Sequence, residues 1–390
     1  MKYLWVLFLL LQGGIPLFAQ HIEDKNCVYT VLSDSTVVLT TYQYNGNIDW
    51  KNDCLSIDSM VVHEGKRYRV VAIGEKAFQS DNHLLQAYLN NVKQVFLPET
   101  VKEICSDAFY NRFNSLQRIS FPGSLEVIGN NSFASLPSLS EISIKSVNGT
   151  GDWAFSINPS LARVYMDSCV VSIGKSSFFK CTRLNNVNLE HVFHIDEHAF
   201  ESTSLENLLI PKCKIIGDFA FADCRRIDRI IFSDELQQIS DYAFLNNTAL
   251  KGLDVHSGWI GEGAFMGCTS LQSVFLSDSV ASIGQAAFGG CSSLVEVELP
   301  SNLQRIEALT FMDCKSLKSI VIPESVAFIG EAAFFGAGIA EITIPASVLK
   351  IERDAFQNCK NLKKVILYCS DKIRYEDIFP KHVEIVKKRM

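Results

Sequence analysis

One six-residue phrase recurs along this chain at nearly constant intervals, and this periodicity limits the folds that the chain can adopt. The phrase reads Ile-Gly-x-x-Ala-Phe at residues 73–78, with close variants at 128–133, 216–221, 283–288 and 329–334. Thirteen phenylalanines hold its last position, and after a first gap of 31 residues their spacing is 21 to 24. Such regular similarity predicts a solenoid of about 13 stacked coils. The anchors are Phe78, Phe109, Phe133, Phe155, Phe178, Phe200, Phe221, Phe244, Phe265, Phe288, Phe311, Phe334 and Phe356.

Each interval between anchors also holds a short alternating segment of the form Leu-x-x-Ile-x-Ile, as at residues 116–121 and 317–322. Apolar residues at every second position are typical of a half-buried β-strand. The residue before each anchor is small, ten times Ala and otherwise Ser132, Ser177 or Thr310, which lets adjacent coils approach closely. One coil cannot bury its apolar side chains alone, so we expect the strands of successive coils to pair into a parallel sheet.

The fullest form of the repeat occupies residues 283–300, where Ile-Gly-Gln-Ala-Ala-Phe is followed by Cys291, a Leu-x-x-Val-x-Leu strand and Pro300. This pattern resembles the leucine-rich repeat of BspA-like bacterial surface proteins, and the resemblance covers about residues 70–370. The sequence departs from the pattern before two anchors, where 150–151 reads Thr-Gly and 306–307 reads Ile-Glu. Both departures fall at backbone positions of the coil.

The resemblance implies a leucine-rich-repeat solenoid of the α/β type, in which short parallel strands are joined by irregular, 3-10 or short helical coils. It also implies export, because family members are secreted or surface proteins of anaerobic bacteria and some protozoa. The better-studied members adhere to host matrix proteins or to other cells. Repeats are scaffolds, so the resemblance specifies the fold more closely than the function.

The chain is expected to divide into four segments. They are a signal peptide over 1–19, an N-terminal β cap over 20–70, the repeats over 71–370 and a C-terminal cap over 371–390. Alternation at 28–44, 55–62 and 68–73 predicts the strands of the first cap, and 383–386 a last strand. The long first gap predicts an inserted loop over residues 79–91.

The first residues carry the pattern of a secretory signal. Lys2 supplies its positive charge, residues 4–11 its apolar core and Ala19 the small residue at which cleavage is expected. The core is too short for a membrane-spanning helix, and no second apolar segment of spanning length follows. An uncleaved anchor is the alternative. We expect an exported bacterial protein at the cell surface, in the periplasm or in the medium.

Six of the twelve cysteines lie three residues after an anchor, where other repeats place Asn, Thr or Ala. This position suits a buried, structural side chain that satisfies backbone groups of the coil. Cys27 and Cys54 flank the strands of the predicted cap and are the best candidates for a disulfide. Zinc is not expected, because no Cys-x-x-Cys occurs. The six repeat cysteines are Cys181, Cys224, Cys268, Cys291, Cys314 and Cys359.

Patterns of catalytic or cofactor chemistry are weak. His191, His194 and His198 with Asp196 form the one metal-like cluster, but His198 occupies a freely variable repeat position typical of a solvated coil. The Gly-Lys-Ser at 174–176 lacks the upstream glycine of a phosphate loop. No Gly-x-Ser-x-Gly elbow occurs. We expect no enzyme, metal or cofactor, and the net charge of -7 argues against a nucleic-acid partner.

Strand alternation assigns an outward side to each strand, and the outward residues are the candidate binding surface. They include aromatic and aliphatic side chains beside arginines, the composition of a protein-binding patch. The alternative is that such residues simply suit strands. The predicted partner-binding residues are Arg163, Tyr165, Asn186, Asn188, Leu209, Arg229, Ile231 and Phe275.

The sequence therefore favours an exported, non-catalytic interaction or adhesion protein. Its partner is expected to be a protein, such as a host matrix or cell-surface protein, bound through the exposed sheet face. One alternative is a glycan-binding protein of a nutrient-capture system, for which Tyr165 with Asn186 and Asn188 comes nearest to a sugar site. A structural component of the cell envelope is the other.

Overall fold

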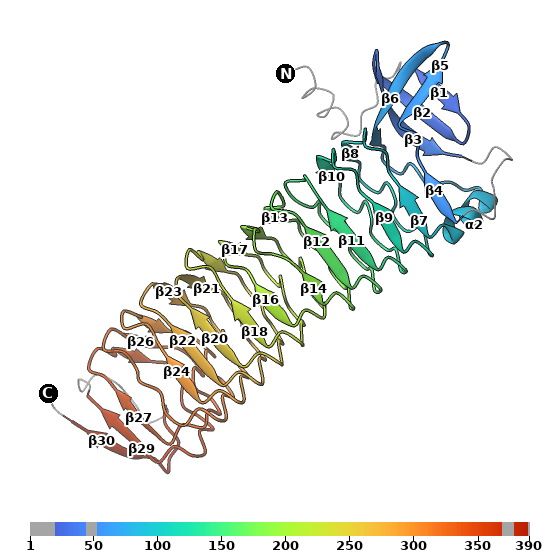
Figure 1. The fold of residues 1–390 in the computed structure, drawn as a ribbon. Coiled ribbons are helices and arrows are strands. Elements are labelled where there is room, and N and C mark those ends of the chain that lie inside the picture. Colours follow the sequence, from blue (N-terminus) through green and yellow to red (C-terminus); the bar gives the residue numbers. More distant parts are fainter. Residues whose placement is uncertain (1–19, 44–52, 369–377, 389–390) are drawn as a thin grey trace. The chain divides into compact units, whose positions relative to one another are not determined.

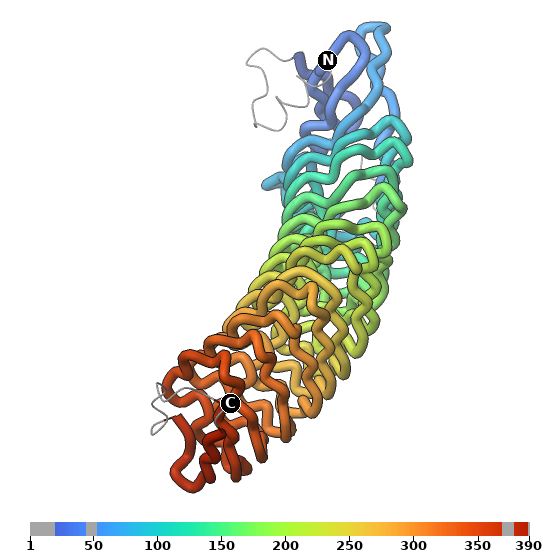
Figure 2. Tube along the Cα trace, turned by 90° about the vertical axis from the view of Figure 1, so that its left-hand side faces the viewer, coloured from blue at the N-terminus to red at the C-terminus, as the bar shows by residue number. Residues whose placement is uncertain are grey.

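The computed structural model describes residues 20–43, 53–368 and 378–388. The predicted signal peptide over residues 1–19 lies outside these residues. The chain forms two compact units, Met1–Asn188 and Leu189–Met390, called here the N-terminal unit and the C-terminal unit. In each unit successive coils lie one upon the next (Figure 2).

The N-terminal unit contains two sheets, to which each coil contributes one strand (Figure 1). The first sheet continues from the antiparallel strands of the predicted cap into parallel strands of the repeats. Its order is β1 (His21–Asp24), β2 (Cys27–Ser33), β3 (Thr36–Tyr42), β6 (Lys66–Ile73), β8 (Glu103–Ile104) and β10 (Val127–Ile128), with β5 (Met60–His63) antiparallel to β6. The second is parallel and runs β4 (Cys54–Ser56), β7 (Gln94–Phe96), β9 (Arg118–Ser120), β11 (Glu141–Ile144), β12 (Arg163–Met166) and β14 (Asn186–Val187).

The remaining strands follow the same plan. β13 (Ser172–Ile173) lies in the N-terminal unit, and the described strands of the C-terminal unit pair in parallel. One set is β15 (His194–Ile195), β17 (Ile215–Ile216), β19 (Gln238–Ile239), β21 (Gly258–Ile260) and β23 (Val280–Ile283), continued by β25 (Arg305–Ile306), β26 (Phe328–Ile329) and β28 (Lys350–Ile351). The other set forms three separate sheets, which are β16 (Asn207–Leu209) with β18 (Arg229–Ile231), then β20 (Gly252–Val255), β22 (Ser273–Leu276) and β24 (Glu296–Glu298), and last β27 (Glu341–Ile344), β29 (Lys364–Leu367) and β30 (Glu384–Lys387).

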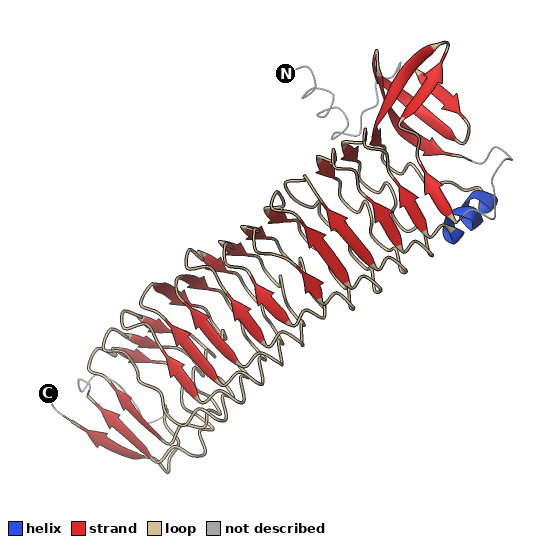
Figure 3. Cartoon of the chain, in the orientation of Figure 1, coloured by secondary structure: helices blue, strands red, loops and turns tan. Residues whose placement is uncertain are grey.

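The chain is thus a parallel-strand solenoid, as the repeats predict, with about 12 turns and almost no helix (Figure 3). Apart from one helix over residues 83–91, turns and bends join the strands in the described residues of the repeats, and the 3-10 or short helical coils that the resemblance allowed are replaced by them. Most turns carry two strands, whereas the sequence indicated only the Leu-x-x-Ile-x-Ile strand, and residues 317–322, where such a strand was predicted, form none. The second strand ends at the Ile of the Ile-Gly phrase, as at β17 and β19, and is mostly two residues long. Alternation cannot be recognised over two residues, which is why this strand was not predicted.

One helix interrupts the pattern, and the loop predicted over residues 79–91 is wrong. Residues His83–Asn91 form α2, the only α-helix in the described part of the chain. The side chain of Asn82 caps its start by accepting the backbone N–H groups of Leu84 and Leu85 at 2.9 and 3.1 Å. Leu85 and Leu89, four residues apart, are fully buried, so packing of one face stabilises the helix.

The core is a ladder of phenylalanine rings. All thirteen anchors have 0% exposed surface. In the C-terminal unit the Phe244 and Phe265 rings are stacked with centroids 5.2 Å apart and planes at 1°. Stacked aromatic pairs contribute about 0.5–1.5 kcal/mol beyond the burial of their area. Phe379, near the other end of the sequence, stacks on the last anchor, Phe356, at 5.0 Å.

Hydrogen bonds between coils explain the small residue before each anchor. The backbone N–H of Phe244 donates to the carbonyl of Ala264, one coil further on, at 2.8 Å, and the N–H of Phe265 donates to Ala287 in the same way. A bulky side chain at the Ala position would crowd this contact. The ladder of rings is therefore fixed by a parallel ladder of backbone hydrogen bonds.

The turn around each anchor requires an unusual backbone. The residue two before the anchor has a left-handed φ between 53° and 62° in every coil, although only Gly263 is a glycine. Leu309 (φ 62°) and Phe219 (φ 54°) show that bulky side chains occupy it too. This conformation costs roughly 1–2 kcal/mol for an L-residue, so burial of the anchor must outweigh it.

Replacement of Phe244 by Ala tests the ladder. We expect it to lower the free energy of unfolding by about 3–5 kcal/mol, because it removes a fully buried ring that stacks on both neighbours. The control is Leu349→Ala, at a side chain that is 73% exposed, with an expected change within about 0.5 kcal/mol. Both are measured by guanidinium denaturation followed by circular dichroism. Equal effects of the two substitutions would contradict the ladder.

Candidate functional site

The candidate surface is the row of outward positions on the strands that follow each anchor turn. Pairing aligns these positions from coil to coil, with Phe96 beside Ser120, Ser143 beside Tyr165 and Leu209 beside Ile231. This confirms the register and the outward direction predicted from alternation. We call these positions the outer column. In strands that have a neighbour on each side, the backbone N–H and C=O groups are hydrogen-bonded within the sheet, so only side chains are available to a partner.

Four of the predicted residues lie together in the N-terminal unit. Tyr165 is 45% exposed, and Arg163 lies two residues before it on the same face of β12. The Arg163 guanidinium donates two hydrogen bonds to Oε2 of Glu141 on β11, at 3.1 and 2.9 Å. This carboxylate raises the pKa of the Arg163 guanidinium, so the charge of Arg163 is partly balanced within the sheet. Asn186 is exposed and lies beside Arg163.

Asn188 has a structural task that the sequence did not reveal. Its Nδ2 donates to the carbonyl of Met166 at 2.6 Å, and its Oδ1 accepts the N–H of Met166 at 2.8 Å. The side-chain amide of Asn188 thus makes with the backbone of Met166 the two hydrogen bonds that a neighbouring strand would otherwise make at the end of β12. Of the two asparagines beside Tyr165, Asn186 is the one whose amide is left for a ligand.

Three further predicted residues lie together in the C-terminal unit. Leu209 and Ile231 are neighbours on β16 and β18 and are 43% and 39% exposed. Arg229 lies two residues before Ile231 on the same face, beside Asn207. Within the described residues Arg229 forms no ion pair. This group therefore joins an exposed apolar pair to an unbalanced positive charge.

The last predicted residue, Phe275, is less available than expected. It lies on β22, outside the pair formed by β16 and β18, and is half-buried. Its ring centroid lies 6.0 Å from that of His256, which covers part of it. Sequence alternation gave the correct side of the strand but could not show this cover from the preceding coil.

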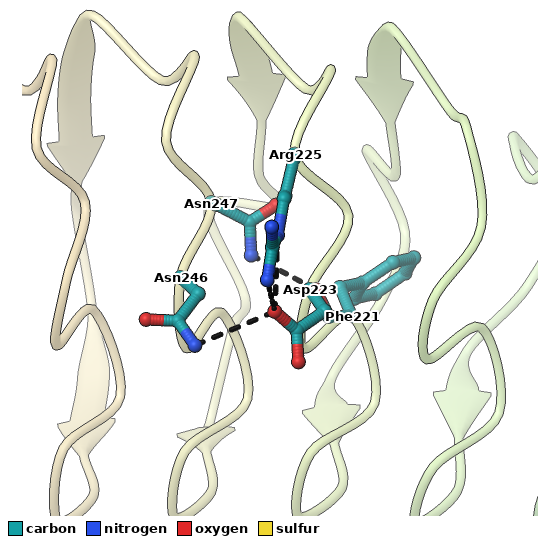
Figure 4. A network of polar contacts seen from close by, with 5 residues as sticks. All are labelled: Phe221, Asp223, Arg225, Asn246 and Asn247. Carbon is teal, nitrogen blue, oxygen red and sulfur yellow. Dashed lines mark hydrogen bonds and ion pairs between the residues drawn. The ribbon is translucent and has the colours of Figure 1, made fainter.

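The repeat cysteines are buried structural thiols, as predicted. Each donates its S–H to the carbonyl of the anchor one coil earlier, as Cys291 does to Phe265 at 3.3 Å. Asn247 fills the same position with an amide that donates to the carbonyl of Phe221 at 2.8 Å (Figure 4). Next to it, Asp223 accepts two hydrogen bonds from Arg225 at the surface of the coil.

Cys27 is buried as a free thiol, and burial raises its pKa to about 11. The Cys54 thiol donates to the carboxylate of Asp53 at 3.5 Å. The predicted bridge between Cys27 and Cys54 is not formed in this structure, and it stays a prediction for the oxidised protein.

The histidines of the cluster lie on the surface of one coil, where His198 is half-buried and its ring stacks on that of Phe219, with centroids 5.0 Å apart. His198 contacts the carboxylates of Glu197 and Glu201, and His191 lies 3.4 Å from the ammonium group of Lys212. Nowhere in the described ranges do three His, Cys, Asp or Glu side chains gather as a metal site would require. The helix in the described part of the chain has neither the length nor the hydrophobicity for a membrane crossing.

The fold and its exposed strand faces define a repeat solenoid of the leucine-rich class. The profile of the BspA-type leucine-rich-repeat region matches the chain in six copies, over residues 52–170, 155–259 and 256–363. The chain therefore belongs to this family. No curated protein sequence matches it.

Solved structures of bacterial proteins agree with this assignment. A leucine-rich cell surface protein from Faecalibacterium prausnitzii is 28% identical, with a TM-score of 0.55 and coverage of 94% of this chain and 98% of that chain. A leucine-rich-repeat protein from Bacteroides ovatus is 26% identical, with a TM-score of 0.57 and coverage of 95% and 99%. The pneumococcal vaccine antigen PcpA shares the fold, at 16% identity and a TM-score of 0.53 over 95% and 94%.

Alkylation of the folded protein tests the buried thiols. Burial raises the pKa of Cys181, Cys224 and Cys268 to about 12, so at about pH 8 they stay protonated as well as covered. We expect iodoacetamide to modify the exposed Cys169 quickly and to reach the repeat cysteines only after denaturant is added. Peptide mapping by mass spectrometry distinguishes the sites. Rapid labelling of Cys224 in the folded chain would refute this prediction.

Proposed function

We propose that this protein is an exported, non-catalytic interaction protein that binds a protein partner through the outer column of its solenoid. The observation that carries the proposal is the group formed by Leu209, Arg229 and Ile231. It combines two aliphatic side chains about 40% exposed with an arginine that has no carboxylate partner in the described residues. Exposed aliphatic surface next to arginine is the composition of a binding patch.

The form of the surface supports a macromolecular partner. The strands of the outer column are short, and β16 and β18 pair only with each other in the C-terminal unit, so the binding energy must come from side chains spread over several coils. A partner with an extended surface can contact many of them at once, whereas a small ligand reaches few. Arg163, Tyr165 and Asn186 in the N-terminal unit offer a second area of the same kind.

Export and surface location are part of the proposal. They are supported by the predicted signal peptide over residues 1–19 and by the similarity to the Faecalibacterium cell surface protein. We propose a cap over residues 20–70, repeats over 71–370 and a second cap over 371–390, with a host matrix or cell-surface protein as the partner.

A triple variant, Leu209→Ser, Arg229→Ser and Ile231→Ser, tests this function. We expect it to weaken binding to a partner from a panel of purified host matrix proteins by at least about tenfold, a loss of about 1.4 kcal/mol. The measurement is surface plasmon resonance with the mature chain.

Leu349→Ser is the matched control, because it removes an exposed leucine that lies outside the outer column. Circular dichroism must show that both variants keep the fold. Undiminished binding by the folded triple variant would place the site elsewhere, and a lack of binding to every protein of the panel would contradict the proposed class of partner.

A further inference from the structure

A hollow of about 410 Å³ lies on the outer face of the N-terminal unit, over β7, β9 and β11. None of the predicted partner-binding residues lines it. It falls within the usual range of ligand pockets, about 300–1,000 Å³. We call it the Phe96 hollow. Its lining includes Phe96, Arg118, Ser120, Phe121, Ser143 and Lys145.

The floor of the hollow is low because two small residues, Ser120 and Ser143, follow Phe96 in the outer column. Phe96 pairs with Ser120, and Ser143 pairs with Tyr165. β11 lies between β9 and β12, so the two serines are neighbours. Phe96 and Tyr165 are 44% and 45% exposed and belong to strands three spacings apart, about 14 Å at 4.8 Å per strand. The serines form a low, hydroxyl-bearing floor beside Phe96, and Tyr165 lies outside the lining of the hollow.

Two positive charges line the hollow without carboxylate partners. Arg118 and Lys145 are exposed, and neither forms an ion pair with any described residue. The acidic groups around them are already engaged. Glu141 is the cross-strand neighbour of Arg118, but its carboxylate accepts two hydrogen bonds from Arg163 on its other side. Asp167 accepts the backbone N–H groups of Ser146 and Cys169. The hollow therefore favours an anionic ligand.

The uncharged groups that line the hollow indicate which kind of anionic ligand it can bind. A peptide could not bind here by adding a strand to the sheet, because β7, β9 and β11 each pair on both sides. The floor offers hydroxyl groups, Gln94 an amide and Phe96 an apolar face. A sugar ring can place its C–H face on the phenyl ring and its hydroxyls on the serines, and a carboxylate can form a bidentate pair with Arg118.

From this combination we infer that the Phe96 hollow is a binding site for a carboxylated saccharide, such as a uronic-acid oligosaccharide. Phe96 supports the sugar ring, Ser120 and Ser143 bind its hydroxyls, and Arg118 and Lys145 hold the carboxylates. This site is separate from the protein-binding function proposed for Leu209, Arg229 and Ile231, because none of those residues lines the hollow.

Isothermal titration calorimetry of the mature chain with trigalacturonate tests the inference. The same trisaccharide as its methyl ester keeps the shape and removes the charge, so we expect it to bind at least about tenfold more weakly. Arg118→Ala and Phe96→Ala should each reduce the affinity for trigalacturonate by about tenfold or more. Ser120→Trp should abolish binding by filling the floor while leaving both positive charges in place.

Lys102→Ala is the matched control, since Lys102 is an exposed lysine of the same unit that pairs with Glu126 outside the hollow. It should leave the affinity unchanged, as should the triple variant of Leu209, Arg229 and Ile231. Absence of binding, equal binding of the ester, or unaltered binding by Arg118→Ala and Phe96→Ala would overturn the inference. Equal, competing binding of hexaglutamate would assign the hollow to acidic peptides and overturn it too.

Discussion

The contact between one anchor phenylalanine and the next is the interaction on which the rest of this structure depends. A single coil has too little apolar surface to offset the entropy lost when its turns are ordered. Stacking places each ring between two others, and the backbone N–H of an anchor such as Phe244 bonds to the following coil at 2.8 Å. This coupling stabilises left-handed residues such as Leu309, and it brings the strands into register.

Much of this arrangement follows from the sequence, because its signals are periodic. The spacing of the anchors predicted the solenoid, and alternation predicted which side chains of each strand face outward. The position of Cys291 three residues after its anchor predicted a buried donor. The features that the sequence did not predict are either very short strands or contacts between residues far apart in the sequence. Two-residue strands such as β17 carry no alternation, and the cap formed by Asn188 exists only because Met166 lies opposite.

The candidate binding surface was also predictable only in part from the sequence. The sequence identified the outward residues one strand at a time, and most of them are exposed as expected. The shape and exposure of the outer column depend on which strands are neighbours, which the sequence does not show. Phe275 is partly covered by His256, whereas two adjacent serines open a hollow beside Phe96. A regular core thus supports an irregular outer face, and differences between repeats at outward positions can create binding sites without a change in the fold.

Native-state hydrogen exchange at the anchor amides tests the central claim most directly. If the ladder carries the fold, the N–H groups of anchors such as Phe221, Phe244 and Phe265, which all bond to the following coil, are among the slowest to exchange in the C-terminal unit. Nuclear magnetic resonance or mass spectrometry would resolve them from surface amides. Exchange of these amides as fast as that of exposed turn residues such as Asp278 would show that coil-to-coil stacking does not hold the structure together.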